Sequence, residues 1–376
     1  MPTTPDWGTP PWRVDVDIAP SAPPARCDVA VVGGGFTGLS AAYHLARRGV
    51  RVALLEASRL GSGASGRTGG IVLEGTAIGP LGRVENCLDA LAAVVARERI
   101  ACELRLSGCW ELMHRRESDS RGRLWRDGDE WLYVSDTVPG GAVDPGALVS
   151  GLGRAARDAG ASLHEDARVL GLEPGRPTRL HLAGGTVEAD HVVVALNGYT
   201  AAVLALPIRL SAALTLALAT DPLAAPALAE LGLRDATPFY TTDLPYLWGR
   251  TTADGRLVLG AGLVHGADVS RVALHDAEAG ATLDRLEERI AWMHPVLARS
   301  RVVARWGGPI AFTPQRTPVL SRLPGASASK VIVYAGCAGH GIALGVRVGQ
   351  LVTEAIVDGV PLPSWGALPG APRNDR

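Results

Sequence analysis

A glycine-rich turn between a short strand and a helix constrains this chain more than any other feature. The strand is predicted over 28–32 and the helix over 37–48, and the turn carries Gly33, Gly35 and Gly38 in the spacing G-x-G-x-x-G. In such a turn the first glycine permits the tight bend, the second lets the backbone approach a pyrophosphate, and the third lets the helix pack on the strand. Since the helix N-terminus then faces the phosphates, the sequence predicts a dinucleotide-binding fold.

Glu56 follows a second predicted strand, over 51–55, at roughly the 20-residue offset at which an acidic side chain accepts hydrogen bonds from the ribose hydroxyls of a dinucleotide. An acid at this place selects an adenosine without a 2′-phosphate. The first strand, the glycine turn, the helix, the second strand and the acidic residue at its end therefore occur in the order and spacing of a dinucleotide-binding unit. An ordinary βαβ unit with a glycine-rich turn is the alternative interpretation.

The overall composition favours a soluble globular protein that binds a small molecule. The 376 residues are 47% hydrophobic, and 37 basic against 38 acidic residues give a formal net charge of −1. A chain of this length can bury a sizeable core, and it lacks the basic surplus that nucleic-acid binding requires. Lysine occurs once, at Lys330, so any role of a lysine ammonium would fall to arginine or histidine.

Cysteine usage and the start of the chain predict a cytoplasmic protein without disulfides, a metal site or a membrane span. The cysteines form an odd set without C-x-x-C spacing, and we expect buried, reduced thiols. Residues 1–26 carry prolines and acidic residues where a signal peptide needs an apolar core, so we expect a surface arm there. The apolar stretch 201–219 is interrupted by Pro207 and Arg209, which favours a buried strand over a bilayer span. The five cysteines are Cys27, Cys87, Cys102, Cys109 and Cys337.

The segment after Glu56 distinguishes between flavin and nicotinamide binding. It reads ASRLGSGASGRTGGIV, an extended run of glycine and serine where an NAD-dependent dehydrogenase would usually continue to its next helix. The string GSGASGRTGG resembles the D-amino-acid oxidase superfamily of flavoproteins, in the branch that contains glycine oxidase, sarcosine oxidase, D-amino-acid dehydrogenase and γ-glutamylputrescine oxidase. The resemblance implies bound FAD, with this loop running under the pyrophosphate and reaching the isoalloxazine.

The resemblance also implies cofactor contacts along most of the chain. In the family the backbone near Val169 meets the adenine, Asn197–Gly198 turns beside the cofactor, and the N-terminus of the last helix stabilises negative charge on the reduced flavin. The Gly-Asp-Ala motif that flavin monooxygenases carry before that helix does not occur here. Besides the motif glycines and Glu56, the predicted cofactor-binding residues are Phe36, Thr37, Ala57, Ser62, Gly63, Ala64, Ser65, Arg67, Thr68, Gly69, Val169, Asn197, Gly198, Gly339, His340, Gly341 and Ile342.

The fold implied by the resemblance is α/β and has two parts. A Rossmann-like FAD-binding domain of the glutathione-reductase-2 type would combine residues 27–85, 140–200 and 305–365. An inserted α+β substrate domain built on an antiparallel sheet would combine 86–139 and 201–304, with a C-terminal tail at 366–376. Segments such as GCWELMHR, LSAALTLALAT, PYLWGRTT and GRLVLGAGLV predict the strands of that sheet. Residues 275–293 predict a charged amphipathic helix whose acids and arginines form a solvated face.

Members of the family transfer a hydride from the carbon next to an amine nitrogen to flavin N5, giving an imine that water hydrolyses. The cofactor performs this step, so we expect the protein to orient the substrate and to exclude water. Aromatic side chains could cage a cationic amine, and Arg250 could clamp a carboxylate; sheet packing and a surface arginine are the alternatives. The candidate catalytic residues are Tyr240, Tyr246, Trp248, Arg250, His265 and His340.

Three departures from better-defined relatives direct the substrate hypothesis toward a small amine. The region after Gly262 offers His265 and none of the lysine that sarcosine-oxidase-like enzymes use to activate oxygen, so the electron acceptor is left open. Cysteine is absent between Arg305 and Pro318, which predicts non-covalent FAD. The stretch 306–314 lacks the arginine with which glycine-oxidase-like members bind a carboxylate. An amino-acid oxidase or dehydrogenase, an NAD-dependent dehydrogenase and a non-catalytic flavin protein are the rival hypotheses.

Overall fold

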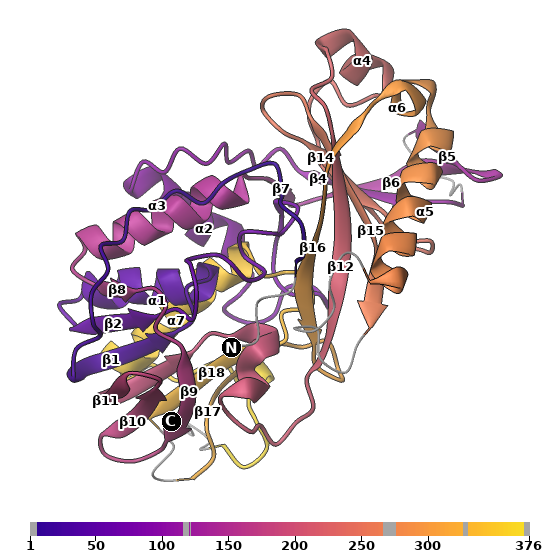
Figure 1. Cartoon of the computed structure of the whole chain (residues 1–376). Coiled ribbons are helices and arrows are strands. Elements are labelled where there is room, and N and C mark those ends of the chain that lie inside the picture. Colours follow the sequence, from indigo (N-terminus) through magenta and orange to yellow (C-terminus); the bar gives the residue numbers. More distant parts are fainter. Residues whose placement is uncertain (1–5, 116–119, 121, 266–275, 326–329, 372–376) are drawn as a thin grey trace.

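Two large β-sheets lie beside each other in the computed structural model, which describes residues 6–115, 120, 122–265, 276–325 and 330–371. Figure 1 shows helices packed against a face of each sheet. The sheet that contains the glycine-turn strand is called the first sheet below, and the other is called the second sheet. Each combines segments that are far apart in the sequence, because the chain passes between them more than once.

The first sheet has a parallel centre built from short apolar runs. All residues of the strands Val52–Leu55 and Val331–Ala335 are buried, as is typical of parallel strands covered on both faces. The carboxyl ends of the parallel strands meet at one edge of the sheet, where α/β folds bind their ligands. Across the sheet the parallel strands are β18 (Val331–Ala335), β11 (Gly185–Val194), β1 (Arg26–Val32), β2 (Val52–Leu55) and β8 (Ser162–His164).

Antiparallel strands extend this centre, and a helical layer covers one of its faces. Ser40 in the first helix donates a hydrogen bond of 2.7 Å to the carbonyl oxygen of Val346 in the last, so these two helices cross in direct contact. The antiparallel strands are β17 (Val319–Arg322), β9 (Val169–Glu173) and β10 (Thr178–Leu182). The helices are α1 (Phe36–Ala46), α2 (Cys87–Arg97), α3 (Pro145–Asp158) and α7 (Ala343–Val357), which share one apolar core.

The second sheet is mostly antiparallel, with one exception to the predicted pattern. Its strands β13 and β4 run parallel, which is possible because they come from distant segments and are not joined by a hairpin. In spatial order the strands are β16 (Val302–Phe312), β12 (Ser211–Thr220), β15 (Leu257–His265), β14 (Trp248–Thr251), β13 (Phe239–Thr241), β4 (Cys109–Met113), β6 (Glu130–Val138) and β5 (Gly122–Asp127). The four segments predicted as strands therefore form β4, β12, β14 and β15.

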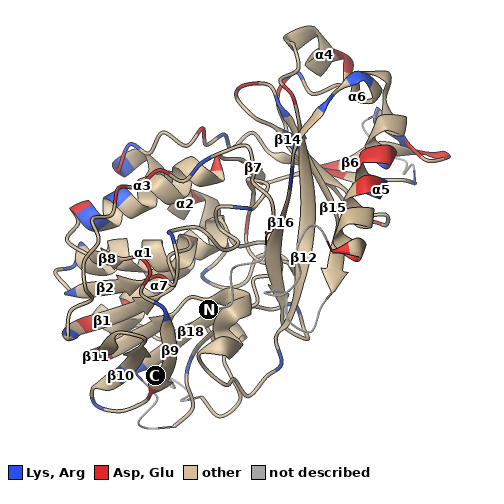
Figure 2. Cartoon of the chain, in the orientation of Figure 1, with Lys and Arg blue, Asp and Glu red and all other residues tan. Residues whose placement is uncertain are grey.

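Helix α5 (Ala277–Met293) covers the face of the second sheet that is turned away from the first sheet (Figure 1). Its buried residues recur at helical spacing, and acidic residues lie along it in Figure 2, so the predicted amphipathic helix is confirmed. Arg289 is the exception to the predicted solvated face, because its guanidinium pairs with buried Asp127. Smaller elements are α4 (Ala225–Glu230), α6 (Pro295–Arg299), β3 (Ile71–Leu73), β7 (Gly140–Ala142), η1 (Asn197–Ala202) and η3 (Ser364–Gly366).

The N-terminal arm is more deeply packed than a surface arm. Trp7 and Trp12 are both buried, with 2% and 7% of their surface exposed. The indole Nε1 of Trp12 donates to the carbonyl oxygen of Gly66 at 2.8 Å, and its ring meets Trp306 edge-on. The prediction is therefore wrong for these two tryptophans, because their apolar partners come from distant parts of the chain. Trp12 packs with Ala217 and Trp306, and Trp7 packs with Leu214 of β12 and Leu283 of α5.

The structure differs from the expected division of the chain at three further places. Helix α2, expected with the second sheet, packs into the core of the first. Strand β16 begins at Val302 and pairs with β12, so residues 305–312 belong to the second sheet. Leu368 in the expected tail is buried and donates its N–H to Ser321.

All five cysteines are buried and unpaired, as predicted. Among the described residues, none of the helices combines the length and apolar character needed to cross a bilayer.

Candidate functional site

The glycine turn has the close packing that its motif predicts. Gly33 has a φ of +108°, and a Cβ atom there would lie 2.7 Å from the carbonyl oxygen of Ala195 at the end of β11. A Cβ atom on Gly38 would lie 1.9 Å from the carbonyl oxygen of Gly33. A side chain at either position would collide with backbone, so only glycine lets the strand, the turn and α1 approach this closely.

Two helix N-termini lie together at the carboxyl edge of the first sheet. A Cβ atom on Gly345 in the first turn of α7 would lie 2.8 Å from Oγ1 of Thr37 in the first turn of α1. Within the described chain, neither helix has a side-chain N-cap or an acidic residue in its first turn. Such N-termini carry a partial positive charge and free N–H groups, so this edge can accept an anionic group.

Glu56 lies at the end of β2, where its carboxylate is held by backbone N–H groups. Gly34 donates to Oε2 at 2.8 Å and Ser58 donates to Oε1 at 2.9 Å. Burial raises the pKa of Glu56, and these hydrogen bonds act in the opposite direction. Ala57 follows directly, and Ala167 donates to the carbonyl oxygen of Glu56 at 2.7 Å, so the segment that leads to Val169 lies at the same strand end.

The loop 57–70 closes over the glycine turn. Ser65 accepts a hydrogen bond of 3.0 Å from the N–H of Phe36, and the ring of Tyr199 approaches Gly63. The carbonyl oxygens of Ser62 and Ala64 accept hydrogen bonds from the side chain and the backbone of Arg67. The guanidinium of Arg67 donates to the carbonyl oxygen of Gly8 in the arm at 2.8 Å. Arg67 therefore joins the loop to the arm, and Thr68 and Gly69 continue from it toward the second sheet.

The loop before α7 approaches the same edge from the other side. Asn197 has a φ of +46°, and its Oδ1 accepts a hydrogen bond of 2.8 Å from the N–H of Gly336. Gly198 follows in η1 and packs against Ala311 of β16. Gly339, with a φ of +90°, leads to His340, Gly341 and Ile342. Gly339, His340 and Ile342 line a small pocket together with Ile71 and Leu73 of β3.

The inner face of the second sheet, defined as the face that carries Trp248, is turned toward the loop 57–70. A Cβ atom on Gly69 would lie 2.1 Å from the Trp248 ring, and one on Gly260 would lie 2.0 Å from it, so the indole fills the space between these glycines. Tyr240 pairs with Trp248 across the strands, and Glu111 pairs with Tyr240. Because directly paired residues point to the same side of a sheet, Trp248, Tyr240 and Glu111 form a row on the inner face.

Glu111 and Tyr240 are joined by a hydrogen bond in which the Tyr240 hydroxyl donates to Oε1 of Glu111. Burial raises the pKa of Tyr240, and the Glu111 carboxylate raises it further, so the phenol stays protonated and remains a donor. Sequence reasoning missed Glu111. The sequence does show a single carboxylate within the apolar strand CWELM. A carboxylate on a covered sheet face costs free energy unless it has a binding partner, and this cost could have pointed to Glu111.

Arg250 is not a surface arginine, and only part of its guanidinium is available to bind a ligand. Only 2% of the residue is exposed, and its Nε donates to the carbonyl oxygen of Gly69. Its Nη1 donates to its neighbour Thr251 at 3.3 Å, and Nη2 has no hydrogen-bond partner among the described residues. Burial lowers the pKa of Arg250 to about 10, with the charge of Asp144 acting against the shift. Arg250 therefore joins β14 to the loop that ends at Gly70.

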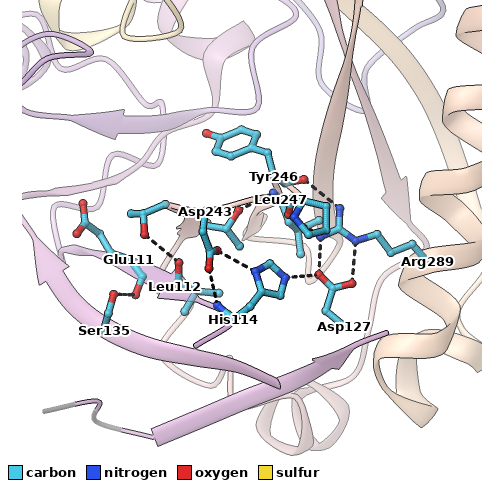
Figure 3. A network of polar contacts seen from close by, with 12 residues as sticks. Glu111, Leu112, His114, Asp127, Ser135, Asp243, Tyr246, Leu247 and Arg289 are labelled. Carbon is cyan, nitrogen blue, oxygen red and sulfur yellow. Dashed lines mark hydrogen bonds and ion pairs between the residues drawn. The ribbon is translucent and has the colours of Figure 1, made fainter. Parts of the chain in front are cut away.

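Tyr246 belongs to a loop between β13 and β14 that a buried polar network holds in place (Figure 3). His114 contacts Asp127 through Nε2 and Asp243 through Nδ1, both at 2.8 Å. Asp127 is also bound by the guanidinium of Arg289, which donates to the carbonyl oxygen of Tyr246 at 3.0 Å. The network therefore fixes the backbone of the loop, and the Tyr246 side chain is left 46% exposed.

Two charge effects compete within this network. Burial acts to lower the pKa of His114, but its hydrogen bonds with Asp127 and Asp243 outweigh burial and raise the pKa above the ordinary value. Burial alone would raise the pKa of Asp127, yet the hydrogen bonds from Arg289 and His114 hold it below its ordinary range. Both ring nitrogens of His114 therefore face a carboxylate, an arrangement that favours the charged imidazolium over the neutral ring.

Comparison with known proteins identifies the family. The family model described as FAD dependent oxidoreductase (DAO) matches residues 28–355 of the chain. The chain belongs to this family. The gamma-glutamylputrescine oxidoreductase of Escherichia coli (strain K12) is 28% identical to this oxidoreductase over 375 residues, covering 88% of this chain and 83% of the relative. The glycine oxidase of Geobacillus kaustophilus (strain HTA426) is 28% identical over 368 residues, covering 88% and 93%.

Solved structures show the same fold as this FAD-dependent oxidoreductase. The L-proline dehydrogenase from P. horikoshii has a TM-score of 0.75 at 18% identity, with 90% of this chain and 96% of that chain covered. The glycine oxidase from Geobacillus kaustophilus has a TM-score of 0.70 at 23% identity, with 89% and 95% covered. The mixed α/β architecture is therefore that of flavoenzymes of this family.

Of the predicted site residues in this flavoenzyme, one does not join the others. His265 is exposed at the end of β15, five residues beyond Gly260, which puts it roughly 15 Å along the strand from the row that contains Trp248. Residues 266–275, which follow His265, lie outside the described residues. His340 lies at the edge of the first sheet, and burial lowers its pKa, which favours the neutral imidazole. In the described part of the chain, no group of three His, Cys, Asp or Glu side chains could hold a metal ion.

Proposed function

We propose that this flavoenzyme oxidises the C–N bond of a small amine. The observation that carries the proposal is the inner face of the second sheet, where Trp248 packs against Gly69, Tyr240 and Glu111 continue the same row, and Arg250 is bonded to main-chain carbonyls. A cationic or hydrogen-bonding amine suits such a face, and a carboxylate would meet repulsion from Glu111. The name of the Escherichia coli relative, a gamma-glutamylputrescine oxidoreductase, supports the same substrate class.

The cofactor site proposed for FAD is the carboxyl edge of the first sheet, which we regard as a Rossmann-like domain of the glutathione-reductase-2 type. The close backbone approach at Gly33 and Gly38 and the N-termini of α1 and α7, whose own N-cap residues make no side-chain cap, fit a dinucleotide with two phosphates. Glu56 would accept the ribose hydroxyls, and backbone near Val169 would meet the adenine. The loop residues 62–69, Asn197–Gly198 and 339–342 would complete the contacts.

When bound, the flavin supplies a two-electron acceptor for a hydride from the carbon next to the amine nitrogen. Trp248 and Tyr240 would hold the substrate chain against the loop that ends at Gly69 and would exclude water from the reacting carbon. The amine must lose a proton before its lone pair can form the imine double bond as the hydride leaves. Tyr246, on its network-held loop, would close the outer end of this space.

An anaerobic flavin-bleaching experiment tests the proposal. Purified holoenzyme is mixed with matched pairs of amines and amino acids of equal chain length, and loss of the flavin absorbance is followed. We expect bleaching by amines at rates at least about 10-fold higher, since a carboxylate beside Trp248, about 10 Å from Glu111, meets a repulsion on the order of 1–2 kcal/mol. Bleaching by amino acids alone would overturn the proposal in favour of an amino-acid oxidase or dehydrogenase, which the glycine oxidase relative favours.

We further propose that FAD is bound non-covalently and that the enzyme is cytoplasmic, with oxygen or another molecule as the acceptor. Phe312 of the stretch 305–318 forms a β-bridge with Cys337, which places one thiol beside that stretch. Burial raises the pKa of Cys337, so this thiol is a poor nucleophile. Acid precipitation should leave yellow cofactor in the supernatant. Flavin that stays with the pellet, and that Cys337→Ser releases, would contradict the proposal.

A further inference from the structure

In the part of the chain that the structure describes, the Glu111 carboxylate has no cationic partner. Its Oε1 accepts the Tyr240 hydroxyl, and Oε2 has no hydrogen bond or ion pair among the described residues. The side chain is half-buried on the inner face of the second sheet. A partly desolvated, unpaired carboxylate is unfavourable in the free protein, so its position is best explained by a cationic partner that arrives with the substrate.

The row on the inner face gives the distance between this carboxylate and the proposed reaction centre. Trp248 contacts Gly69, and the strands β14, β13 and β4 place Trp248, Tyr240 and Glu111 side by side. Neighbouring strands are about 4.8 Å apart, so Glu111 is about 10 Å across the sheet from Trp248. The surface between them is the Tyr240 ring, an apolar wall with a negative face that suits an alkyl chain ending in an ammonium group.

We propose that Glu111 binds a second cationic group of the substrate, at the end remote from the oxidised carbon, so that the preferred substrates are linear diamines. The amine to be oxidised would lie beside Trp248, the alkyl chain would follow Tyr240, and the remote ammonium would form an ion pair with Glu111. The Tyr240 hydroxyl orients the carboxylate by its bond to Oε1 and leaves Oε2 for the ammonium. This inference rests on the proposed oxidation of amines and names the substrate class.

The test compares cadaverine with pentylamine, which have the same carbon chain and differ in the second amino group. The rate constant for anaerobic flavin reduction divided by the apparent Kd is measured for both amines with the holoenzyme. We expect the wild type to prefer cadaverine at least about 10-fold, since a charged hydrogen bond is worth roughly 10- to 100-fold in binding. In Glu111→Gln the preference should fall to about 1, while flavin content and Tm show that the variant is folded.

Two further variants sharpen the test. Asp136→Asn removes a carboxylate from the exposed position that pairs with Glu111 on β6, one strand further from Trp248, and should keep the cadaverine preference. Glu111→Asp keeps the charge on a side chain one methylene shorter, so the optimum should move to a longer diamine. A wild type without preference, or equal loss of preference in Asp136→Asn and Glu111→Gln, would overturn the inference and leave amine oxidation standing. If neither amine bleaches the flavin while amino acids do, the proposed function falls as well.

Discussion

The two sheets contribute to the candidate site in different ways. The first sheet contributes the ends of its strands, where β1, β2, β11 and β18 run into turns, and the atoms presented there are mainly backbone N–H and C=O groups. The second sheet contributes its face, where side chains from the middle of β4, β13 and β14 stand in a row. The difference matters because backbone groups are the same in every relative of a fold, whereas side chains on a face can change one at a time.

This difference indicates which sheet binds the cofactor and which sheet selects the substrate. A site made of backbone requires glycines, close packing and helix ends, so it tolerates almost no substitution and serves one cofactor. A site made of side chains on a rigid sheet can change specificity without changing the fold. Substitutions at the carboxyl edge of the first sheet should therefore weaken flavin binding, and substitutions on the inner face of the second sheet should change selectivity and spare the flavin.

The largest effect is expected for Gly38→Val. A Cβ atom at this position would lie 1.9 Å from the carbonyl oxygen of Gly33, so α1 must move away from the turn. We expect flavin binding to weaken by about 1,000-fold, or about 4 kcal/mol, and the purified protein to be colourless. The control is Gly171→Val in β9, where an added Cβ has no atom within 4 Å. A yellow Gly38→Val protein with unchanged flavin affinity would contradict the assignment of cofactor binding to the edge of the first sheet.

Arg250→Ala should cost about 3 kcal/mol of the free energy of unfolding, because it leaves the buried carbonyl of Gly69 without its donor and opens a cavity. The measurement is urea unfolding of the holoenzyme. Arg256→Ala is the matched control, since Arg256 forms an exposed ion pair with Asp254, and it should cost less than about 1 kcal/mol. A stable Arg250→Ala variant that selectively loses reduction by amino acids would instead assign Arg250 to carboxylate binding.

Glu56→Gln should weaken FAD binding by roughly 2 kcal/mol, about 30-fold in Kd, because a neutral amide replaces a charged acceptor of the ribose hydroxyls. Reconstitution of the apoprotein with FAD, followed by flavin fluorescence, measures this change. Glu188→Gln on β11 removes a carboxylate that pairs with Arg179 at the surface, and it should leave the Kd unchanged. Equal affinities of wild type and Glu56→Gln would remove Glu56 from the ribose site.

The smallest effect is expected for His114→Asn and depends on pH. The folded-state pKa of His114 is raised, so its stabilising contribution is complete below the ordinary histidine pKa near 6.5 and is lost as pH rises through the folded value. The unfolding free energy of wild type minus that of His114→Asn should therefore shrink from pH 5 to pH 9. His181→Asn, at an exposed position, is the control. A difference that grows with pH would mean that His114 is neutral between its two carboxylates.

Much of the fold was accessible from the sequence because the relevant residues are neighbours along the chain. The G-x-G-x-x-G turn, the strand that ends at Glu56 and the glycines before α7 each lie within one short segment. Periodicity was also sufficient for α5 and for strands such as β12. The burial of Trp12 was not accessible, because the arm around it is polar and its partner Trp306 is almost 300 residues away.

The sequence by itself determined the family, the glycine turn with its acidic partner, and the strands and helix around that turn, since these depend on local spacing and on backbone conformation. Only the tertiary structure decided that Tyr240 binds Glu111, that Arg250 is bonded to Gly69, and that His265 lies away from the row on the inner face. The physical reason is strand register: pairing between distant strands determines which side chains share a face, and a shift by one residue would turn every one of them to the other side.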